Sequence, residues 1–182
     1  MLDSLRRLRH SFGFGVHSPF AFRFVRDVVR APRSCSYYCH DELHSLLRPL
    51  PRQRRRTCKL IFRLAARMGF RHVCISAGAD NAIKHAVSPA LGNADFRVGI
   101  PRHPSPGTLA ICRADELPLD FSAADWPSDC VLVVTHTSYA GKAIMEVIMS
   151  SLHGGWTFEG KHMSIMVTDA SQQLCRLSIL LP

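Results

Sequence analysis

The chain has 182 residues and a mass of 20.3 kDa, with 47% hydrophobic and 20% charged residues. This length suits a single domain, and the composition excludes wholesale disorder. No apolar run approaches the roughly 18 residues that a membrane helix requires, which excludes a membrane-spanning protein. The first ten residues lack the continuous apolar stretch of a secretory signal.

The net charge of +9 is concentrated in the first part of the chain. Residues 1–72 carry sixteen Lys and Arg against four Asp and Glu, whereas residues 73–182 carry seven against ten. An arginine-rich segment is typical of a surface that binds nucleic acid or anionic lipid. It is more often explained by helices with a solvated basic face. Both interpretations stay open.

The pattern before Gly69 is helical. Phe20, Phe24 and Val28 recur at four-residue steps behind Ser18-Pro19, which predicts an amphipathic helix with Ser as cap and Pro in the first turn. A second short helix is expected over 41–50. A third carries an apolar stripe from Leu60 to Met68 and ends at Gly69.

After Gly69 short apolar runs alternate with helical stretches. We expect strands over 72–76, 96–100, 108–112, 130–134, 163–167 and 174–181, and helices over 81–91 and 141–152. Prolines exclude a helix between the second and third strands. The last two strands are expected to form a terminal antiparallel hairpin. The pattern predicts an α/β three-layer sandwich with a Rossmann-like, mostly parallel sheet. Residues 1–70 would form a helical leader packed on a core of residues 71–182, within a single domain of residues 1–182.

The seven cysteines are an odd number and widely scattered. Cys74, Cys112 and Cys130 lie inside apolar runs, as reduced core thiols do, which favours a reducing, cytoplasmic compartment. Four further residues have the ligand types of a zinc site, but their spacing is looser than usual and we predict no metal; they are Cys35, Cys39, His40 and His44.

Two parts of the sequence resemble a known family. One is the N-terminal Gly-Phe-Gly-Val-His-Ser-Pro-Phe of residues 13–20, with Tyr37-Tyr38 and the helical residues 59–64. The other is the tail, residues 157–167 and 175–181. Both are similar to small bacterial class I S-adenosylmethionine-dependent methyltransferases. The resemblance implies the cofactor S-adenosylmethionine and methyl transfer to an unknown acceptor.

The resemblance also implies positions for cofactor-binding residues. Gly78 matches the first glycine of the loop after strand one, beside Asp80, while Ser76 stands where the family has an acid. No acid follows strand two. Asp115 matches the acid that contacts adenine, and Thr135 takes the place of an acid after the strand over 130–134.

Two histidines are candidate catalytic residues. His136 follows the strand over 130–134, where an open α/β sheet places ligands, and is a candidate general base. His17 either helps to cap the first helix or, by the resemblance, lines the cofactor cleft under the leader.

Three hypotheses of function remain. They are an active methyltransferase, a catalytically inactive binding or scaffold protein of the same fold, and an RNA-binding protein that uses the arginine-rich residues 1–72. The sequence leaves the oligomeric state open.

Overall fold

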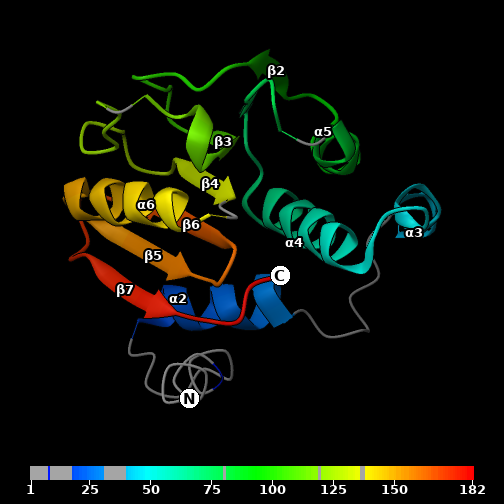
Figure 1. Cartoon of the computed structure of the whole chain (residues 1–182), viewed down its shortest axis with the longest axis horizontal. Helices are drawn as coiled ribbons and strands as arrows, with labels where there is room; N and C mark the ends of the chain where they lie inside the picture. The colour runs from blue at the N-terminus through cyan, green and yellow to red at the C-terminus, as the bar shows by residue number, and fades with distance from the viewer. Residues whose placement is uncertain (1–7, 9–17, 31–39, 80, 119, 136–137) are drawn as a thin grey trace.

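The computed structural model describes residues 8, 18–30, 40–79, 81–118, 120–135 and 138–182. A seven-stranded sheet forms the middle layer, with strand order β2-β1-β3-β4-β6-β5-β7 (Figure 1). Its strands are β1 His72–Ile75, β2 Asp95–Val98, β3 Thr108–Arg113, β4 Val131–Thr135, β5 Gly155–Glu159, β6 Met163–Thr168 and β7 Cys175–Ser178. Six strands run in one direction, and β6 alone runs antiparallel to both its neighbours, β4 and β5.

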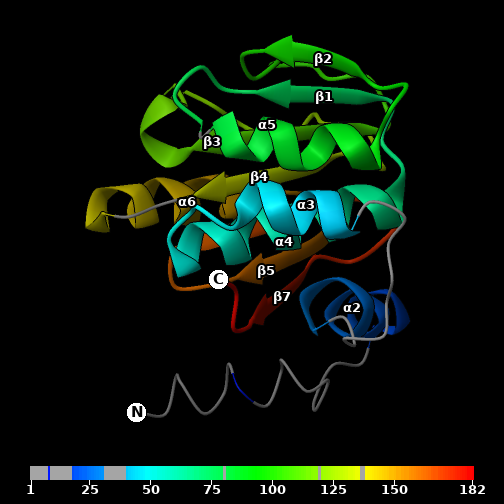
Figure 2. The ribbon, with the colours of Figure 1, turned by 90° about the vertical axis from the view of Figure 1, so that its right-hand side faces the viewer.

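Helices cover both faces of this sheet. They are α2 Pro19–Phe24, the π-helical η1 Val25–Arg30, α3 His40–Leu47, α4 Arg52–Met68, α5 Asn81–Val87 and α6 Tyr139–Ser151, with the short 3₁₀ turns η2 Ser88–Ala90 and η3 Ala114–Glu116. Figure 2 shows α3, α4 and α5 on one side of the sheet. The hydrophobic cluster on this face joins residues of α2, α3, α4 and α5 to the strands. A second cluster lies under α6 and the segment after β3. The expected α/β layered architecture is therefore confirmed.

Helix α4 behaves as its sequence predicts. In its apolar stripe Leu60, Ile61 and Leu64 are fully buried and Met68 is half-buried, and the helix ends at Gly69. Gly69 has a φ of 67°, a left-handed conformation that favours glycine. Helix α4 thereby turns directly into β1, and its N-terminal half lies near the ends of the central strands.

Helix α2 is held on β5 by aromatic contacts. The rings of Phe20 and Trp156 stack at 4.1 Å between centroids, as do those of Phe24 and Phe158. The Trp156 indole N–H donates to Ser18 Oγ over 2.9 Å, and this same oxygen caps α2 by accepting from the Ala21 N–H. The predicted cap is confirmed, and Ser18 also ties the helix to the sheet.

The prediction that residues 163–167 and 174–181 form a terminal antiparallel hairpin is wrong. The hairpin forms between β5 and β6, and β7 pairs parallel with β5 on its other side. The sequence analysis assigned no strand to β5, whose two aromatic residues are buried by partners 130 or more positions away in α2. Such distant partners leave no trace in local periodicity.

Two other elements match closely. The proline-rich segment 99–107 between β2 and β3 contains no helix, as expected, and the helix predicted over 81–91 ends as α5 followed by the 3₁₀ turn η2 at Pro89. Among the described residues, no helix has the length and apolar character needed to cross a membrane.

Candidate functional site at the carboxyl edge of the sheet

The sheet has a point where its strand order reverses. The chain passes from β1 to β2 on one side of β1 and then returns to β3 on the other side. In open α/β sheets, ligands bind outside the carboxyl ends of the strands at such a point. The carboxyl ends of β1 and β3 are followed here by Ser76–Ala79 and by η3.

The carboxylate of Glu116 fills the gap between these two strand ends. It accepts a hydrogen bond from the Ser76 hydroxyl, one from the Gly78 N–H over 2.6 Å and one from the Arg113 N–H over 3.2 Å. The Ser76 side chain is buried. The donors of the first turn are therefore satisfied by the chain's own acid.

Glu116 also explains the glycine at position 78. A Cβ built on Gly78 would collide with the Glu116 carboxylate before meeting anything else. The resemblance implies a glycine here because the cofactor would pass close to the backbone. In the structure, the group that passes close to this backbone is a side chain of the same protein.

Asp115, the predicted adenine contact, pairs with Arg113. Its two oxygens accept from Arg113 Nε over 3.0 Å and from a terminal guanidinium nitrogen over 2.5 Å. This hydrogen bonding lowers the pKa of Asp115 below its usual range. Both side chains are exposed, so Asp115 is an ionised surface group that partly neutralises Arg113.

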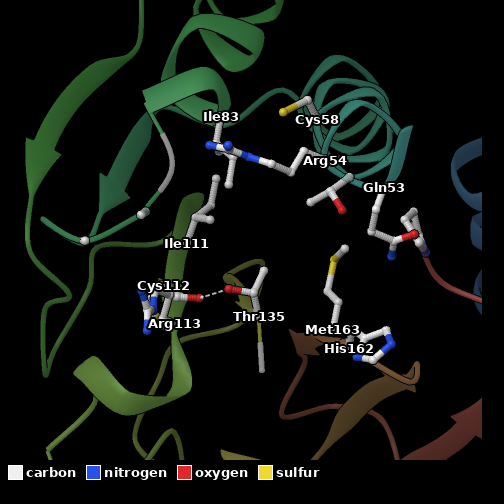
Figure 3. A pocket seen from close by; sticks show the side chains of 14 residues that line it. Gln53, Arg54, Cys58, Ile83, Ile111, Cys112, Arg113, Thr135, His162 and Met163 are labelled. Carbon is white, nitrogen blue, oxygen red and sulfur yellow. Dashed lines mark hydrogen bonds between the residues drawn. The ribbon is translucent and has the colours of Figure 1, made fainter. Parts of the chain in front are cut away.

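A cavity of about 340 Å³ opens beside this bridge, between α4 and the ends of β1, β3 and β4 (Figure 3). We call it the carboxyl-edge pocket; its lining residues are Gln53, Arg54, Thr57, Cys58, Gly78, Ala79, Ile83, Ile111, Cys112, Arg113, Thr135, His162, Met163 and Pro182. Its volume lies within the range of small-molecule sites. The leader helix α4 thus covers part of the pocket, while no residue of α2 lines it.

The walls of the carboxyl-edge pocket are apolar and its charged groups are basic. Ile83, Ile111 and Met163 are buried beneath it. Arg54 extends from α4 across the pocket toward Ile83, and His162 projects from the turn between β5 and β6 (Figure 3). Among the described residues that line the pocket, none is an acid.

The floor of the pocket contains one hydrogen bond between strands and one buried thiol. The Thr135 hydroxyl donates to the Cys112 carbonyl over 3.3 Å, which joins the ends of β4 and β3. Cys112 is 1% exposed, and the burial of its thiol, with a smaller contribution from the Glu116 charge, raises the pKa of this thiol. Cys112 is therefore a protonated core thiol at neutral pH rather than a nucleophile.

The structure brings together only part of the predicted site. Gly78 and Thr135 line the pocket, and Ser76 lies at its edge in the Glu116 bridge. Other predicted residues lie outside the described residues; they are His17, Asp80 and His136, together with Cys35 and Cys39 of the weighed zinc pattern. Within the described part of the chain, no three His, Cys, Asp or Glu side chains cluster as metal ligands.

Three residues of this edge were missed by the sequence analysis: Arg54, Glu116 and His162. Arg54 enters the sequence analysis only as one of the basic residues of the arginine-rich segment 1–72. Glu116 directly follows Asp115 after a predicted strand, so the acidic pair was itself a usable signal. His162 lies in a turn that becomes recognisable only when β5 is assigned as a strand.

Part of the basic charge in the leader has internal partners. Arg63 donates to the backbone carbonyls of Val28 and Val29 over 2.7 and 3.2 Å, and Arg67 pairs with Asp27 over 3.4 Å. These contacts fasten η1 to α4. The exposed basic residues at the start of α4, among them Arg52, Arg54 and Arg56, lie at the pocket end of the helix.

Comparison with known proteins adds no identification: no protein-family model matches the sequence, and no curated protein or solved structure matches it.

The acids and hydrogen-bond acceptors described at this edge suit S-adenosylmethionine poorly. That cofactor carries a positive sulfonium and an ammonium group, and its ribose hydroxyls call for an acceptor. Ser76 replaces the acid of strand one, Gly99-Ile100 provides none after β2, and Asp115 is already paired with Arg113. Glu116, the nearest described acid, is used by the turn itself.

Proposed function

We propose that this chain is a methyltransferase-like protein that binds a small ligand in the carboxyl-edge pocket without transferring a methyl group. A mainly parallel sheet with an antiparallel strand near its end supports the resemblance to methyltransferases. Fold alone does not define activity, so the proposal depends on the site.

The observation that carries the proposal is the Glu116 bridge beside an open pocket. Glu116 uses the hydroxyl of Ser76 and the N–H of Gly78, the groups nearest to where the resemblance places the methionine part of the cofactor. The pocket next to it keeps a volume and an apolar lining that suit a small molecule. These features favour the binding of a small ligand over methyl transfer from S-adenosylmethionine.

Calorimetric titration tests this proposal. The ligands are S-adenosylmethionine, S-adenosylhomocysteine, and two matched pairs of probes: adenosine with adenosine monophosphate, and octanol with octanoate. We expect no saturable heat from the two cofactor forms and saturable binding of at least one probe. Thr57→Phe, which places a ring in the pocket from α4, should abolish that binding.

Two results would overturn the proposal. One is tight binding of S-adenosylmethionine that Asp115→Ala weakens, which is the outcome expected of an active methyltransferase. The other is the absence of binding by every probe. Circular dichroism of Thr57→Phe must match the parent protein, so that lost binding reports a filled pocket.

RNA binding by residues 1–72 stays a prediction. Its signature is an affinity that falls steeply with salt, because Arg–phosphate contacts release counterions. The internal contacts of Arg63 and Arg67 remove two of its arginines from such a surface.

A further inference from the structure

Helix α4 carries a basic face that is separate from the carboxyl-edge pocket. Its 17 residues include seven Arg and Lys and no Asp or Glu. Four of these cations recur at spacings of three and four residues, which places them on one side of the helix; they are Arg52, Arg55, Arg56 and Lys59. We call these four residues the basic face of α4. None of them lines the carboxyl-edge pocket.

In the described part of the chain, no ion pair or side-chain hydrogen bond involves the basic face of α4. The later cations of the helix differ, because Arg63 donates to the Val28 and Val29 carbonyls and Arg67 pairs with Asp27. The second half of α4 therefore uses its positive charge to hold η1, whereas the first half presents its positive charge to solvent.

The stability of α4 does not explain this face. Like charges three or four residues apart on a helix repel each other, and cations in the first turn oppose the positive end of the helix dipole. The first turn contains no acid, and no side chain caps its N-terminus. The basic face therefore destabilises α4 in the free protein, and an anionic partner would offset this repulsion.

Part of the basic face lines a second cavity, of about 320 Å³, which we call the α4 groove. Arg56 and Lys59 belong to its lining, and the other lining residues are Val29, Arg63, Leu180, Leu181 and Pro182. The C-terminal residues lie against α4 in both views of the fold (Figures 1 and 2). None of the described residues that line the groove is acidic. The groove thus combines two cations with an apolar wall.

The arrangement of the cations indicates the kind of anion. From Arg52 to Lys59 the basic face extends over about 10 Å of the helix axis, which suits a chain of repeated anions better than one small ion. Arginine guanidinium groups match the geometry of phosphate oxygens. Basic grooves that follow the phosphate backbone are typical of proteins that bind single-stranded nucleic acid.

The recessed shape of the site favours a single strand over other polyanions. A flexible single strand can enter a groove of this size, and its sugars and bases can contact Val29 and Leu181. A duplex is a rigid convex surface, and a lipid headgroup layer is nearly flat. Both of these would meet the exposed Arg52 and leave the interior of the groove empty.

We infer that the α4 groove binds single-stranded nucleic acid through its phosphates, with the basic face of α4 as the contact. This inference goes beyond the proposed function, because it concerns another face of α4 and another class of ligand. Arg56 and Lys59 contact phosphates within the groove, and Arg52 and Arg55 extend the contact toward the start of the helix.

Fluorescence anisotropy with a labelled oligouridine of about twelve nucleotides tests the inference. The affinity should fall about 20- to 50-fold between about 50 and 200 mM salt, because three or four phosphate contacts release their counterions. The same measurement is made with an RNA duplex of equal length. Binding to vesicles of phosphatidylserine and phosphatidylcholine is measured by sedimentation. The single strand should bind more tightly than either.

Two double variants locate the contact. Arg56→Gln with Lys59→Gln should lower the affinity for oligouridine at least about tenfold at low salt and reduce the slope of its salt dependence by about 1.4. Arg71→Gln with Lys142→Gln removes the same residue types and the same charge from exposed positions before β1 and on α6. This control should change the affinity by less than about threefold. Circular dichroism of both variants must match the parent protein.

Several outcomes would overturn the inference. One is an equal loss of affinity in the two double variants, which would assign the binding to net charge. Others are tighter binding of the duplex or of the vesicles, and the absence of oligouridine binding at low salt, which would leave the basic face as a solvated surface. Thr57→Phe fills the carboxyl-edge pocket and should leave oligouridine binding unchanged, so this inference and the proposed function can each fail separately. Loss of oligouridine binding in Thr57→Phe would place the strand in the wrong cavity for the inference.

Discussion

Two regions of the carboxyl edge of this sheet differ in whether a side chain of the protein occupies the space beyond the strand ends. At the ends of β1 and β3 the backbone and hydroxyl donors are satisfied by Glu116, and the turn is complete without a ligand. At the ends of β3 and β4, under α4, the chain leaves a cavity whose charged lining is basic. The first region uses a charge to stabilise the fold, and the second encloses an open cavity.

This difference explains why family motifs alone are a poor guide here. Gly78 is where a cofactor loop would have a glycine, but its small size accommodates a carboxylate of the same chain. The cavity under α4 is lined by other residues, such as Thr57 and His162, which the resemblance does not include among its cofactor residues. The two regions would not differ in this way if Glu116 contributed nothing to the free energy of unfolding.

The largest effect is expected for Glu116→Ala. It leaves the buried Ser76 hydroxyl and the Gly78 N–H without their acceptor, and hydrogen bonds to charged groups contribute about 1.5–3 kcal/mol each in favourable cases. We expect the free energy of unfolding in urea to fall by an amount in this range. Asp120→Ala, which removes an exposed acid from a surface ion pair, should change it by less than about 0.5 kcal/mol.

A double variant tests whether the glycine at position 78 is required only because of the Glu116 carboxylate. Gly78→Ala alone should destabilise the protein by displacing the Glu116 carboxylate, but in the Glu116→Ala background the added methyl meets no carboxylate. The double variant should therefore be no less stable than Glu116→Ala, a clear departure from additivity. Additive losses would mean that Gly78 is required for a reason other than Glu116.

The sequence predicts the elements of this edge better than their contacts. The continuous apolar run at β4, the left-handed Gly69 and the proline-rich connection before β3 each follow from local chemistry, and all are found. Each depends on residues a few positions apart. Backbone preference and burial of a single run are sufficient to specify them.

The contacts that define the site join residues far apart in the chain. Glu116 meets Ser76 and Gly78 because β3 lies beside β1, although β2 intervenes in the sequence. Likewise β7 pairs with β5 rather than with the preceding β6, a choice that depends on which sheet edge is free. Periodicity carries no information on such neighbours. The sequence therefore shows that Ser76 replaces the acid of the family, but it does not show that Glu116 lies beside this turn.

A smaller effect is expected for Cys112, which lies between the two regions. Burial, aided by the Glu116 charge, raises the pKa of its thiol in the folded state, whereas an unfolded cysteine has a pKa of about 8.5. Above this value the unfolded chain releases a proton that the folded chain keeps, so stability falls as pH rises. Each such thiol should reduce the free energy of unfolding by about 1 kcal/mol between pH 9 and pH 10.

Urea unfolding at these two pH values measures this loss, and Cys112→Ala should decrease it. The pH difference is taken within each variant, so the cost of the smaller side chain cancels. Burial also raises the pKa values of Cys74 and Cys130, which remain in the variant and keep part of the loss. A loss that is the same in both proteins would contradict the assignment to Cys112.

The smallest effect on stability is expected for Arg52→Gln. Arg52 is exposed and lies in the first turn of α4, where the positive end of the helix dipole opposes a cation. Replacing it should leave the free energy of unfolding within about 0.5 kcal/mol of the parent value or raise it slightly. Arg63→Gln is the contrast on the same helix, because its guanidinium donates to the Val28 and Val29 carbonyls, and loss of these bonds should cost about 1–3 kcal/mol. If Arg52→Gln destabilises the protein as much as Arg63→Gln does, the basic start of α4 is part of the fold and not a solvated surface.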